Sequence, residues 1–457
     1  MVERVHYKDF TITALKLLLL SLVSGCVTSS PVTPMPTVNP QQLILFHNGV
    51  VITMNSEQSL ATALAVRGEK INAVGSDDEI LALTKPDAVV IDLQGTTLMP
   101  GFVDPHSHIF NDARQYMSMS LSEAQQLALE NGITTLGDLY VTESFLKEIR
   151  IFDQAGGLQV RTNLYLVATD NCGRPQGDWW KDYPATNSPG EMLRIGGVKI
   201  FADGGTCKDV ALSFEREPGG GFGDLFFEQG ELDRLVNEVH TSNRQVAIHA
   251  LGDRAVEVAQ NAIASVLQGE PNVNRHRIEH NTLVRPELLP RYGEIGVVPI
   301  IYALYPSCEP WWDVPAEYRS WEWPWRALLD ANPRLPIAWH GDDPYSNRVR
   351  PLDELYSFLT RNDVNNEGEV CLAAEWQEAH LITAEEALPM MTVNAAYALF
   401  REDEVGSLEP GKYADMIILS ANPLTDDPHK ILEMEVWMTM VGGRTAYCMA
   451  GQEELCP

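Results

Sequence analysis

Two histidines separated by one residue are the first indication of chemistry in this sequence. His106 and His108 lie in the segment PGFVDPHSHIF, residues 100–110, which has the pattern of a β-strand. Side chains alternate between the two faces of a strand, so both imidazoles should point the same way and could bind one metal ion. Two histidines alone are weak evidence, and the prediction depends on further residues that could join them.

Four later segments each end an apolar, β-branched run with a residue able to complete a metal site. In order they are GGVKIFADGG with Lys199, QVAIHALGD with His249, HRIEHNTLV with His280, and PIAWHGDDP with Asp342. A helix-like pattern follows each segment. Ligands at the carboxyl ends of successive parallel strands, separated by helices, are typical of the active-site face of a (β/α)8 barrel. We therefore predict an α/β protein built on a TIM barrel.

These residues and the phrases around them resemble the metal-dependent amidohydrolase superfamily, and within it the amidohydrolase-3, or YtcJ-like, family. The resemblance spans about residues 43–447 and includes VKIFADGG, VAIHALGDRAV, RIEH and GSLEPGKYADMIIL. One departure is the short stretch of residues 109–133, where relatives usually carry a long insertion. The resemblance implies that one or two divalent ions are held by six residues: His106, His108, Lys199, His249, His280 and Asp342.

The resemblance also implies how these ligands divide their work. His106, His108 and Asp342 would hold one ion, His249 and His280 the other, and Lys199 would bridge them after carbamylation turns its amine into a carboxylate. Zinc suits imidazole and carboxylate ligands best, although iron, manganese, cobalt or nickel could also bind.

A metal-bound hydroxide would then attack an amide carbonyl, with Asp342 as general acid and base. The family phrase aligns Asp342, and not Asp343, with the catalytic aspartate. Strand alternation places His340 on the face of Asp342, either behind the ligands or simply packed in the barrel. Asp203 shares the face of Lys199 and could touch substrate.

The predicted function is hydrolysis of a non-peptide carbon–nitrogen bond, an amide in a small molecule. A hydrolytic deaminase of a heterocycle is the second reading, but such relatives usually lack the bridging lysine and place a glutamate where Gly252 stands. A non-catalytic binding lipoprotein is the third, and it would be favoured if ligands were missing. All six are present.

The composition and charge of the chain limit the classes of molecule that it could bind. The chain has 457 residues, enough for one barrel and a smaller unit, with 45% hydrophobic and 21% charged residues. Its formal net charge of −30 argues against nucleic acid and anionic membrane surfaces as partners, because the field would repel both. A small-molecule substrate remains, and a homo-oligomer stays open.

The N-terminus resembles an export signal. Residues 1–26 combine basic residues, the apolar run LLLLSLV and the lipobox-like ending VSGC, so Cys26 is the predicted lipidation site of a lipoprotein signal peptide. Residues 27–42 are rich in Thr, Ser and Pro and read as a linker. The prediction is an exported protein, lipid-anchored in the bacterial cell envelope, that touches the membrane only through this anchor.

The remaining chain divides into a barrel and a flanking unit. Residues 43–99 and residues 403–457 have short apolar runs broken by glycine, typical of β-hairpins, whereas residues 100–402 alternate strand-like and helix-like patterns. The family resemblance implies that the two end segments join as one discontinuous β-sandwich, the second followed by a C-terminal tail, beside the TIM barrel of residues 100–402.

The cysteine count predicts which cysteines could form disulfide bonds. Without Cys26 six cysteines remain, which permits disulfides in an exported chain. Cys448 with Cys456 is the preferred pair, and Cys207 could instead be a free thiol near the metal.

Three loops are expected near the active site. Residues 170–190, with two tryptophans, are expected to cover the mouth of the site, and the glycine-rich residues 204–227 are expected to form a flexible lid. A tryptophan-rich loop follows Leu304. It would either bind apolar ligand surface or seal the barrel against the flanking β unit or a second subunit. It contains Trp311, Trp312, Trp321, Trp323 and Trp325.

Overall fold

The computed structural model describes residues 39–457 except 217, 309–313, 346–348 and 366. The predicted signal peptide with Cys26, most of the linker, and Trp311 with Trp312 therefore lie outside the described residues. Within the described part of the chain, no helix is both long and apolar enough to cross a membrane.

Eight parallel strands form the central sheet, and each pairs with the next strand along the chain. Nearly every side chain on these strands is buried, as expected for parallel strands covered on both faces. The strands are β8 (Phe102–Ser107), β9 (Ile133–Val141), β10 (Arg161–Val167), β11 (Leu193–Phe201), β12 (Gln245–Ala250), β13 (Arg277–His280), β14 (Val298–Tyr302) and β15 (Ala338–His340).

The two edge strands of this sheet, β8 and β15, meet and nearly close it into a barrel. The amide of His108 donates to the carbonyl of Asp343 at 2.7 Å, and the indole Nε1 of Trp339 donates to the carbonyl of Val103 at 2.8 Å. The first contact brings the chain after His106 against the chain after His340. The predicted (β/α)8 barrel is confirmed.

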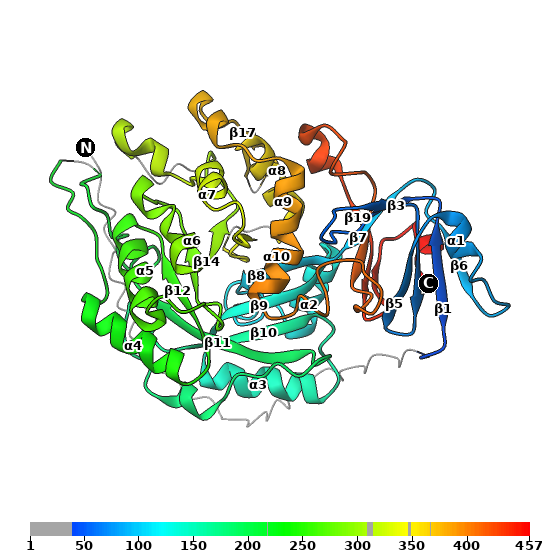
Figure 1. Ribbon diagram of the computed structural model, residues 1–457, viewed down its shortest axis with the longest axis horizontal. Coiled ribbons are helices and arrows are strands. Elements are labelled where there is room, and N and C mark those ends of the chain that lie inside the picture. Colours follow the sequence, from blue (N-terminus) through cyan, green and yellow to red (C-terminus); the bar gives the residue numbers. More distant parts are fainter. Residues whose placement is uncertain (1–38, 217, 309–313, 346–348, 366) are drawn as a thin grey trace, which may run out of the picture.

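Helices pack around the outside of the barrel (Figure 1). Several begin at the caps that the sequence provides; Ser120, for example, accepts the amide of Glu123, whose carboxylate accepts the amide of Ser120. The helices are α2 (Leu121–Glu130), α3 (Glu143–Gln154), α4 (Gln229–Thr241), α5 (Asp253–Leu267), α6 (Arg291–Ile295), α7 (Trp325–Ala331), α8 (Pro351–Thr360), α9 (Ala384–Met391) and α10 (Val393–Ala398). A small hairpin, β16 (Asp363–Val364) with β17 (Val370–Cys371), follows α8.

Between β10 and β11 a 3-10 turn, Trp179–Asp182, takes the place of a helix. The carbonyl of Trp180 accepts from the guanidinium of Arg244, which stands just before β12, at the amino ends of the strands. The expectation that both tryptophans cover the mouth of the site is wrong, because this part of the connection has already crossed to the opposite end of the barrel.

Two sheets whose strands pair mostly antiparallel form the flanking unit. One has four strands in the order β5-β4-β1-β6, and the other has six in the order β20-β19-β18-β7-β2-β3. In Figure 1 the blue and red ends of the chain lie together at one side of the barrel. The elements are β1 (Leu43–His47), β2 (Val50–Ile52), β3 (Leu60–Ala61), β4 (Ala63–Arg67), β5 (Lys70–Gly75), α1 (Asp77–Leu81), β6 (Val89–Asp92), β7 (Thr97–Pro100), β18 (Met416–Leu419), β19 (Val436–Val441) and β20 (Arg444–Cys448).

Strand β7 joins the two ends of the chain, because it pairs antiparallel with β18. Alternation along β18 gives this sheet two buried faces. Met416 and Ile418 face the core between the two sheets, whereas Ile417 and Leu419 belong to the core of the barrel. The discontinuous β-sandwich beside the barrel is confirmed, and one of its sheets packs directly on the barrel.

The cysteines form three disulfides among the described residues. Cys448 pairs with Cys456, as preferred, and Cys308 pairs with Cys371. Cys207 pairs with Cys172, so the expectation of a free thiol near the metal is wrong. This last bond ties the loop after β10 to the loop after β11.

The described part of the tryptophan-rich loop packs against the barrel. Trp323 and Trp325 are both buried, and the guanidinium of Arg361 lies 4.0 Å from the ring centre of Trp325. The indole Nε1 of Trp325 donates to the carbonyl of Tyr302 at 3.1 Å. The contacts of Trp325 are therefore with β14 and the end of α8 in the barrel itself, and not with the β-sandwich.

Candidate metal centre

All six predicted ligands line one pocket at the carboxyl ends of the barrel strands. The pocket has a volume of about 230 Å³. His106 and His108 come from the end of β8, Lys199 from β11 and His249 from β12, and every one of them is buried. His280 ends β13, and Asp342 follows β15 by two residues. The rule that active-site residues gather where parallel strands end accounts for this convergence.

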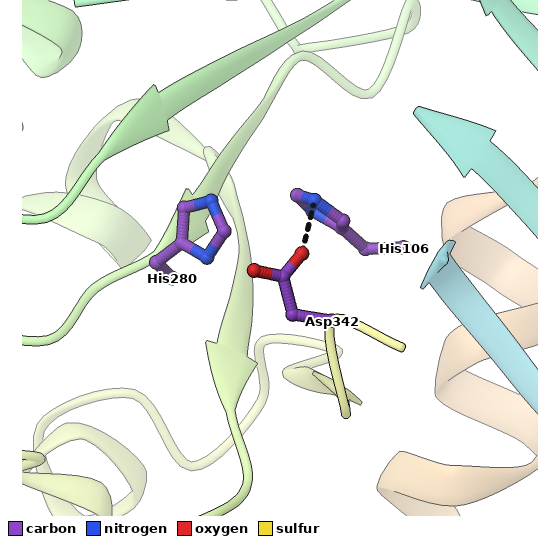
Figure 2. Close-up of side chains that lie close together, drawn as sticks. All are labelled: His106, His280 and Asp342. Atoms are coloured by element: carbon purple, nitrogen blue, oxygen red, sulfur yellow. Dashed lines mark ion pairs between the residues drawn. The ribbon is translucent and has the colours of Figure 1, made fainter. Parts of the chain in front are cut away.

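The tightest group within the pocket consists of His106, His280 and Asp342 (Figure 2). One nitrogen or oxygen atom from each lies within 4.8 Å of the other two, and among the described residues this is the one such group of three or more potential ligands. Asp342 Oδ1 lies 3.2 Å from Nε2 of His106 and 3.4 Å from Nε2 of His108. Three imidazoles thus surround one carboxylate.

Lys199 lies among these groups. Its Nζ is 3.3 Å from Nε2 of His106, and the side chain is fully buried. Burial lowers the pKa of Lys199 to about 8, because the charged ammonium loses its hydration there. A substantial fraction of this amine is therefore neutral near physiological pH.

Burial favours the neutral, metal-binding form of His106, His249 and His280. At His108 burial acts in the same direction, but the hydrogen bond to Asp342 and the charge of its carboxylate outweigh it and raise the pKa. Burial lowers the pKa of His249 to about 3, and burial followed by the charge of nearby His249 lowers the pKa of His280. The rings of these two residues lie 4.5 Å apart in an edge-to-face arrangement. Nε2 of His249 lies 2.9 Å from the carbonyl oxygen of Gly204.

Two of the candidate ligands occupy the left-handed region of backbone conformation. His280 has φ of 72° and Asp342 has φ of 59°, values that L-residues other than Asn, Asp and Gly rarely adopt. Such conformations cost on the order of 1–3 kcal/mol each and concentrate at functional sites. The turn at His280 aims its side chain at the pocket.

A buried ion pair supports His106 from behind, and sequence reasoning missed it. The carboxylate of Glu279 lies 2.6 Å from Nδ1 of His106. Arg277 binds both oxygens of the same carboxylate, at 2.6 and 2.7 Å, and all three side chains are fully buried. Despite the cost of burial, the charge of Arg277 and its hydrogen bonds hold the pKa of Glu279 well below its usual range. An ionised Glu279 accepts a hydrogen bond from the protonated Nδ1 of His106 and leaves Nε2 of this residue free to bind metal.

The residues fit a divalent transition metal. His280 Nε2 and His249 Nδ1 are buried atoms without a hydrogen-bond partner within the described part of the chain, and both rings border the pocket. Buried nitrogens of this kind are costly unless they bind something. Imidazoles, one carboxylate and an amine of lowered pKa are a donor set that suits zinc or a similar ion.

Three residues close to the candidate ligands do not line the metal pocket. His340 is fully buried and stacks on His106 with ring centres 4.5 Å apart, behind the pocket wall. Asp203 accepts the amides of Leu251 and Gly252 at 3.0 and 2.8 Å, and it does not line the pocket, so the expected substrate contact is not found. Asp343 is fully buried and also lies outside the pocket lining.

The remaining wall of the pocket was not predicted. Tyr140 and Phe201 stand at strand ends, and Tyr345 follows Asp342 by three residues, so a search of strand ends could have found them. The others come from loops that carry no motif. These further lining residues are Asp112, Gln115, Tyr116, Tyr140, Asn171, Phe201, Thr206 and Tyr345.

Comparison with known proteins agrees with a barrel that carries these residues at its mouth. The model of the amidohydrolase family matches residues 89–138 and 111–447, and the chain belongs to this family. It is therefore a member of a family of metal-dependent hydrolases, with a candidate metal site at His106, His280 and Asp342. The two matched segments overlap just after β8, where the expected insertion is missing.

The chain is similar to part of the length of two relatives. The chain is 25% identical over 280 residues to the putative amidohydrolase YtcJ of Bacillus subtilis (strain 168), covering 59% of this chain and 50% of that protein. It is 24% identical over 331 residues to the N-substituted formamide deformylase of Arthrobacter pascens, covering 70% and 58% respectively. The chain thus spans between half and three-fifths of the length of these two relatives.

A solved structure shows the same fold. An uncharacterised metal-dependent hydrolase from Pyrococcus horikoshii OT3 superposes with a TM-score of 0.69 at 19% identity, covering 85% of this chain and 99% of that one.

Proposed function

We propose that this protein hydrolyses a non-peptide amide bond in a small molecule. The observation that carries the proposal is the convergence of six residues of metal-binding type on one pocket at the carboxyl ends of the barrel strands. A relative named as an N-substituted formamide deformylase supports an amide as the substrate class.

The proposed ligand roles are those that the family resemblance implies. His106, His108 and Asp342 would hold one divalent ion, and His249 with His280 a second, with Lys199 between them. A bound ion would polarise the amide carbonyl and lower the pKa of a water molecule. The proton transfers would be carried out by side chains of this protein.

Asp342 is the proposed proton carrier. Burial opposes its ionisation, but hydrogen bonds to His106 and His108 hold its pKa well below the usual range, so it is a carboxylate at neutral pH. Its side chain is 22% exposed, in contrast to the fully buried His106, which leaves it accessible to water and substrate in the pocket. It would accept the proton of the attacking water and deliver it to the departing nitrogen.

Lys199 is proposed to act as a carboxylate after carbamylation. The reaction joins the neutral amine nitrogen to the carbon of CO2 and releases the amine proton, which converts a cation into an anion. A pKa of about 8 makes the neutral amine available. The neighbouring imidazoles of His106 and His249 would then face a negative group in place of an ammonium.

The test is turnover by the metal-loaded protein. N-alkylformamides, N-alkylacetamides and aryl amides would be screened by release of the free amine, with adenosine and cytosine included for deaminase activity. We expect amide hydrolysis that a chelator removes and that added zinc or manganese restores. Deamination without amide hydrolysis would overturn the proposal, and Asp342→Asn serves as the control for contaminating hydrolases.

We also propose that the protein is exported and anchored by lipid at Cys26. This residue lies outside the described part of the chain, so the proposal rests on the lipobox-like VSGC. The three disulfides support it, because structural disulfides persist mainly in oxidising compartments outside the cytoplasm.

A further inference from the structure

A second cavity adjoins the metal pocket. It has a volume of about 640 Å³ and lies between the loop after β8, helix α2, and residues 344–345 and 349–350, which stand between β15 and α8. Tyr116 and Tyr345 line both spaces, so the two cavities meet at this pair of side chains. The metal pocket is smaller, at about 230 Å³.

The second cavity is mainly apolar. Met117, Met119, Leu127 and Val349 contribute to its wall. Arg350 is the one charged residue among its described lining, and its guanidinium donates to Asp353 and to the carbonyls of Leu432 and Met434. That cation is already bound by the protein, so the lining favours an uncharged, apolar occupant.

The tyrosine pair belongs to the walls of both cavities. The rings of Tyr116 and Tyr345 meet edge to face with centres 5.4 Å apart, and these residues are 59% and 41% exposed. The hydroxyl of Tyr345 donates to Asp112 at 2.6 Å, and its ring lies 5.2 Å from the ring of His108. One side chain therefore borders a metal ligand on one side and the apolar cavity on the other. Aromatic surface left open in this way gains stability when a ligand covers it.

From this shared wall we infer that the second cavity receives an apolar substituent of the substrate while the amide lies at the metal centre. The inference rests on the proposed function and narrows its substrate class to amides that carry an alkyl or aryl arm. A substrate arm fits this space better than a protein segment because the cavity and the metal pocket share Tyr116 and Tyr345 in their walls. The arm would cross the tyrosine pair and end among Met117, Met119 and Leu127.

The experiment compares matched substrates. One series lengthens the amine side, from N-methylacetamide to N-hexylacetamide, and the other lengthens the acyl side, from N-methylacetamide to N-methylhexanamide. We expect the hexyl or hexanoyl member of one series to have a kcat/KM at least about tenfold higher, from burial of added methylene groups. The series that gains identifies which side of the amide faces the cavity. Equal kcat/KM values in both series overturn the inference.

Variants locate the effect in the cavity. Met119→Asp places a charge in the wall, and Met119→Asn adds polarity without charge, in case the first does not fold. Each should lower the long-to-short ratio of kcat/KM about tenfold. Val273→Asp is the matched control, because Val273 is 73% exposed in the connection between α5 and β13, and the ratio should not change. An unchanged ratio in both folded Met119 variants contradicts the inference.

A binding measurement separates this inference from the proposed function. Hexylamine and hexanoate, products of the two long substrates, are titrated calorimetrically against methylamine and acetate without any turnover. Tighter binding of a six-carbon product, weakened by Met119→Asn, supports the apolar site even if no amide is hydrolysed. Amide hydrolysis with no preference for longer products or substrates leaves the proposed function standing and removes the inference.

Discussion

Glu279 lies 2.6 Å from Nδ1 of His106 and is itself clamped by Arg277, so a buried ion pair determines which nitrogen of this histidine faces the pocket. Glu279→Gln would keep the shape but lose the negative charge, and Arg277 would be left as a buried cation. We expect metal affinity to fall by roughly 10–100-fold and the free energy of unfolding to fall by about 3–5 kcal/mol. Competition with a chelating dye and denaturant unfolding measure the two effects.

Glu402→Gln is the control for this change. Glu402 forms an ion pair with Arg275 just before β13, at the opposite end of the barrel. Metal affinity of this variant should match that of the unaltered protein. Metal affinity within twofold of normal in Glu279→Gln would contradict the role of Glu279 in orienting His106.

Asp342→Asn tests the proton carrier. The amide keeps one oxygen that can bind metal but cannot accept a proton, so turnover should fall by roughly 10²-fold or more while most of the metal is retained. Turnover and metal content are measured on the same preparation. Asp343→Asn should cost less turnover, because Asp343 lies outside the pocket lining. Greater loss in Asp343→Asn at saturating metal would move the catalytic carboxylate by one residue.

Lys199 predicts a pH dependence for assembly of the site. Only the neutral amine combines with CO2, and a pKa lowered from 10.5 to about 8 shifts the rise in neutral amine to lower pH. Protein stripped of metal and CO2 should therefore regain metal binding at a rate that rises with pH, with its midpoint near 8. The measurement holds dissolved CO2 constant between pH 6 and 9.5.

Lys199→Ala is the control, and it should show no recovery that depends on CO2. Short carboxylates such as acetate should restore part of its metal binding by replacing the missing group. Recovery in the unaltered protein that is independent of CO2 would argue against carbamylation.

The disulfide between Cys172 and Cys207 predicts an effect on substrate binding. The adjacent residues Asn171 and Thr206 line the metal pocket and share a hydrogen bond of 3.1 Å. Replacing both cysteines by serine should raise KM several-fold and lower the free energy of unfolding by about 2–4 kcal/mol. The matched control, serine at Cys448 and Cys456 in the β-sandwich, should leave KM unchanged. A KM that is the same in both double variants would mean that this bond does not support the pocket.

Cys26 predicts the cellular location. Cys26→Ser should move the protein from the membrane fraction to the soluble fraction, or leave an unprocessed form of higher mass. Fractionation with mass determination of the N-terminus tests this. Identical partition and mass of variant and unaltered protein would remove the lipid anchor.

Strand ends were predictable because they depend on local patterns. The apolar runs before Lys199, His249 and His280 alternate with helix patterns, and each run proved to be a barrel strand. That the two end segments of the chain join in one β-sandwich was expected only through family resemblance. The pairing of β7 with β18 that joins them was not predicted, since no local pattern relates residues 97–100 to residues 416–419. The role of Glu279 was missed because simple alternation puts it on the face opposite His280, and the positive φ of His280 brings both toward the same centre.

The amino-acid sequence by itself determined the ligand types and the family, because both depend on residue identity and order along the chain. Only the tertiary structure decided which ligands come within 4.8 Å of one another, that Arg277 and Glu279 stand behind His106, and that an apolar cavity opens beside the metal pocket. These relationships join residues far apart in sequence. They depend on the register of the closing strands, on left-handed backbone at His280 and Asp342, and on the packing of loops, none of which a local pattern specifies.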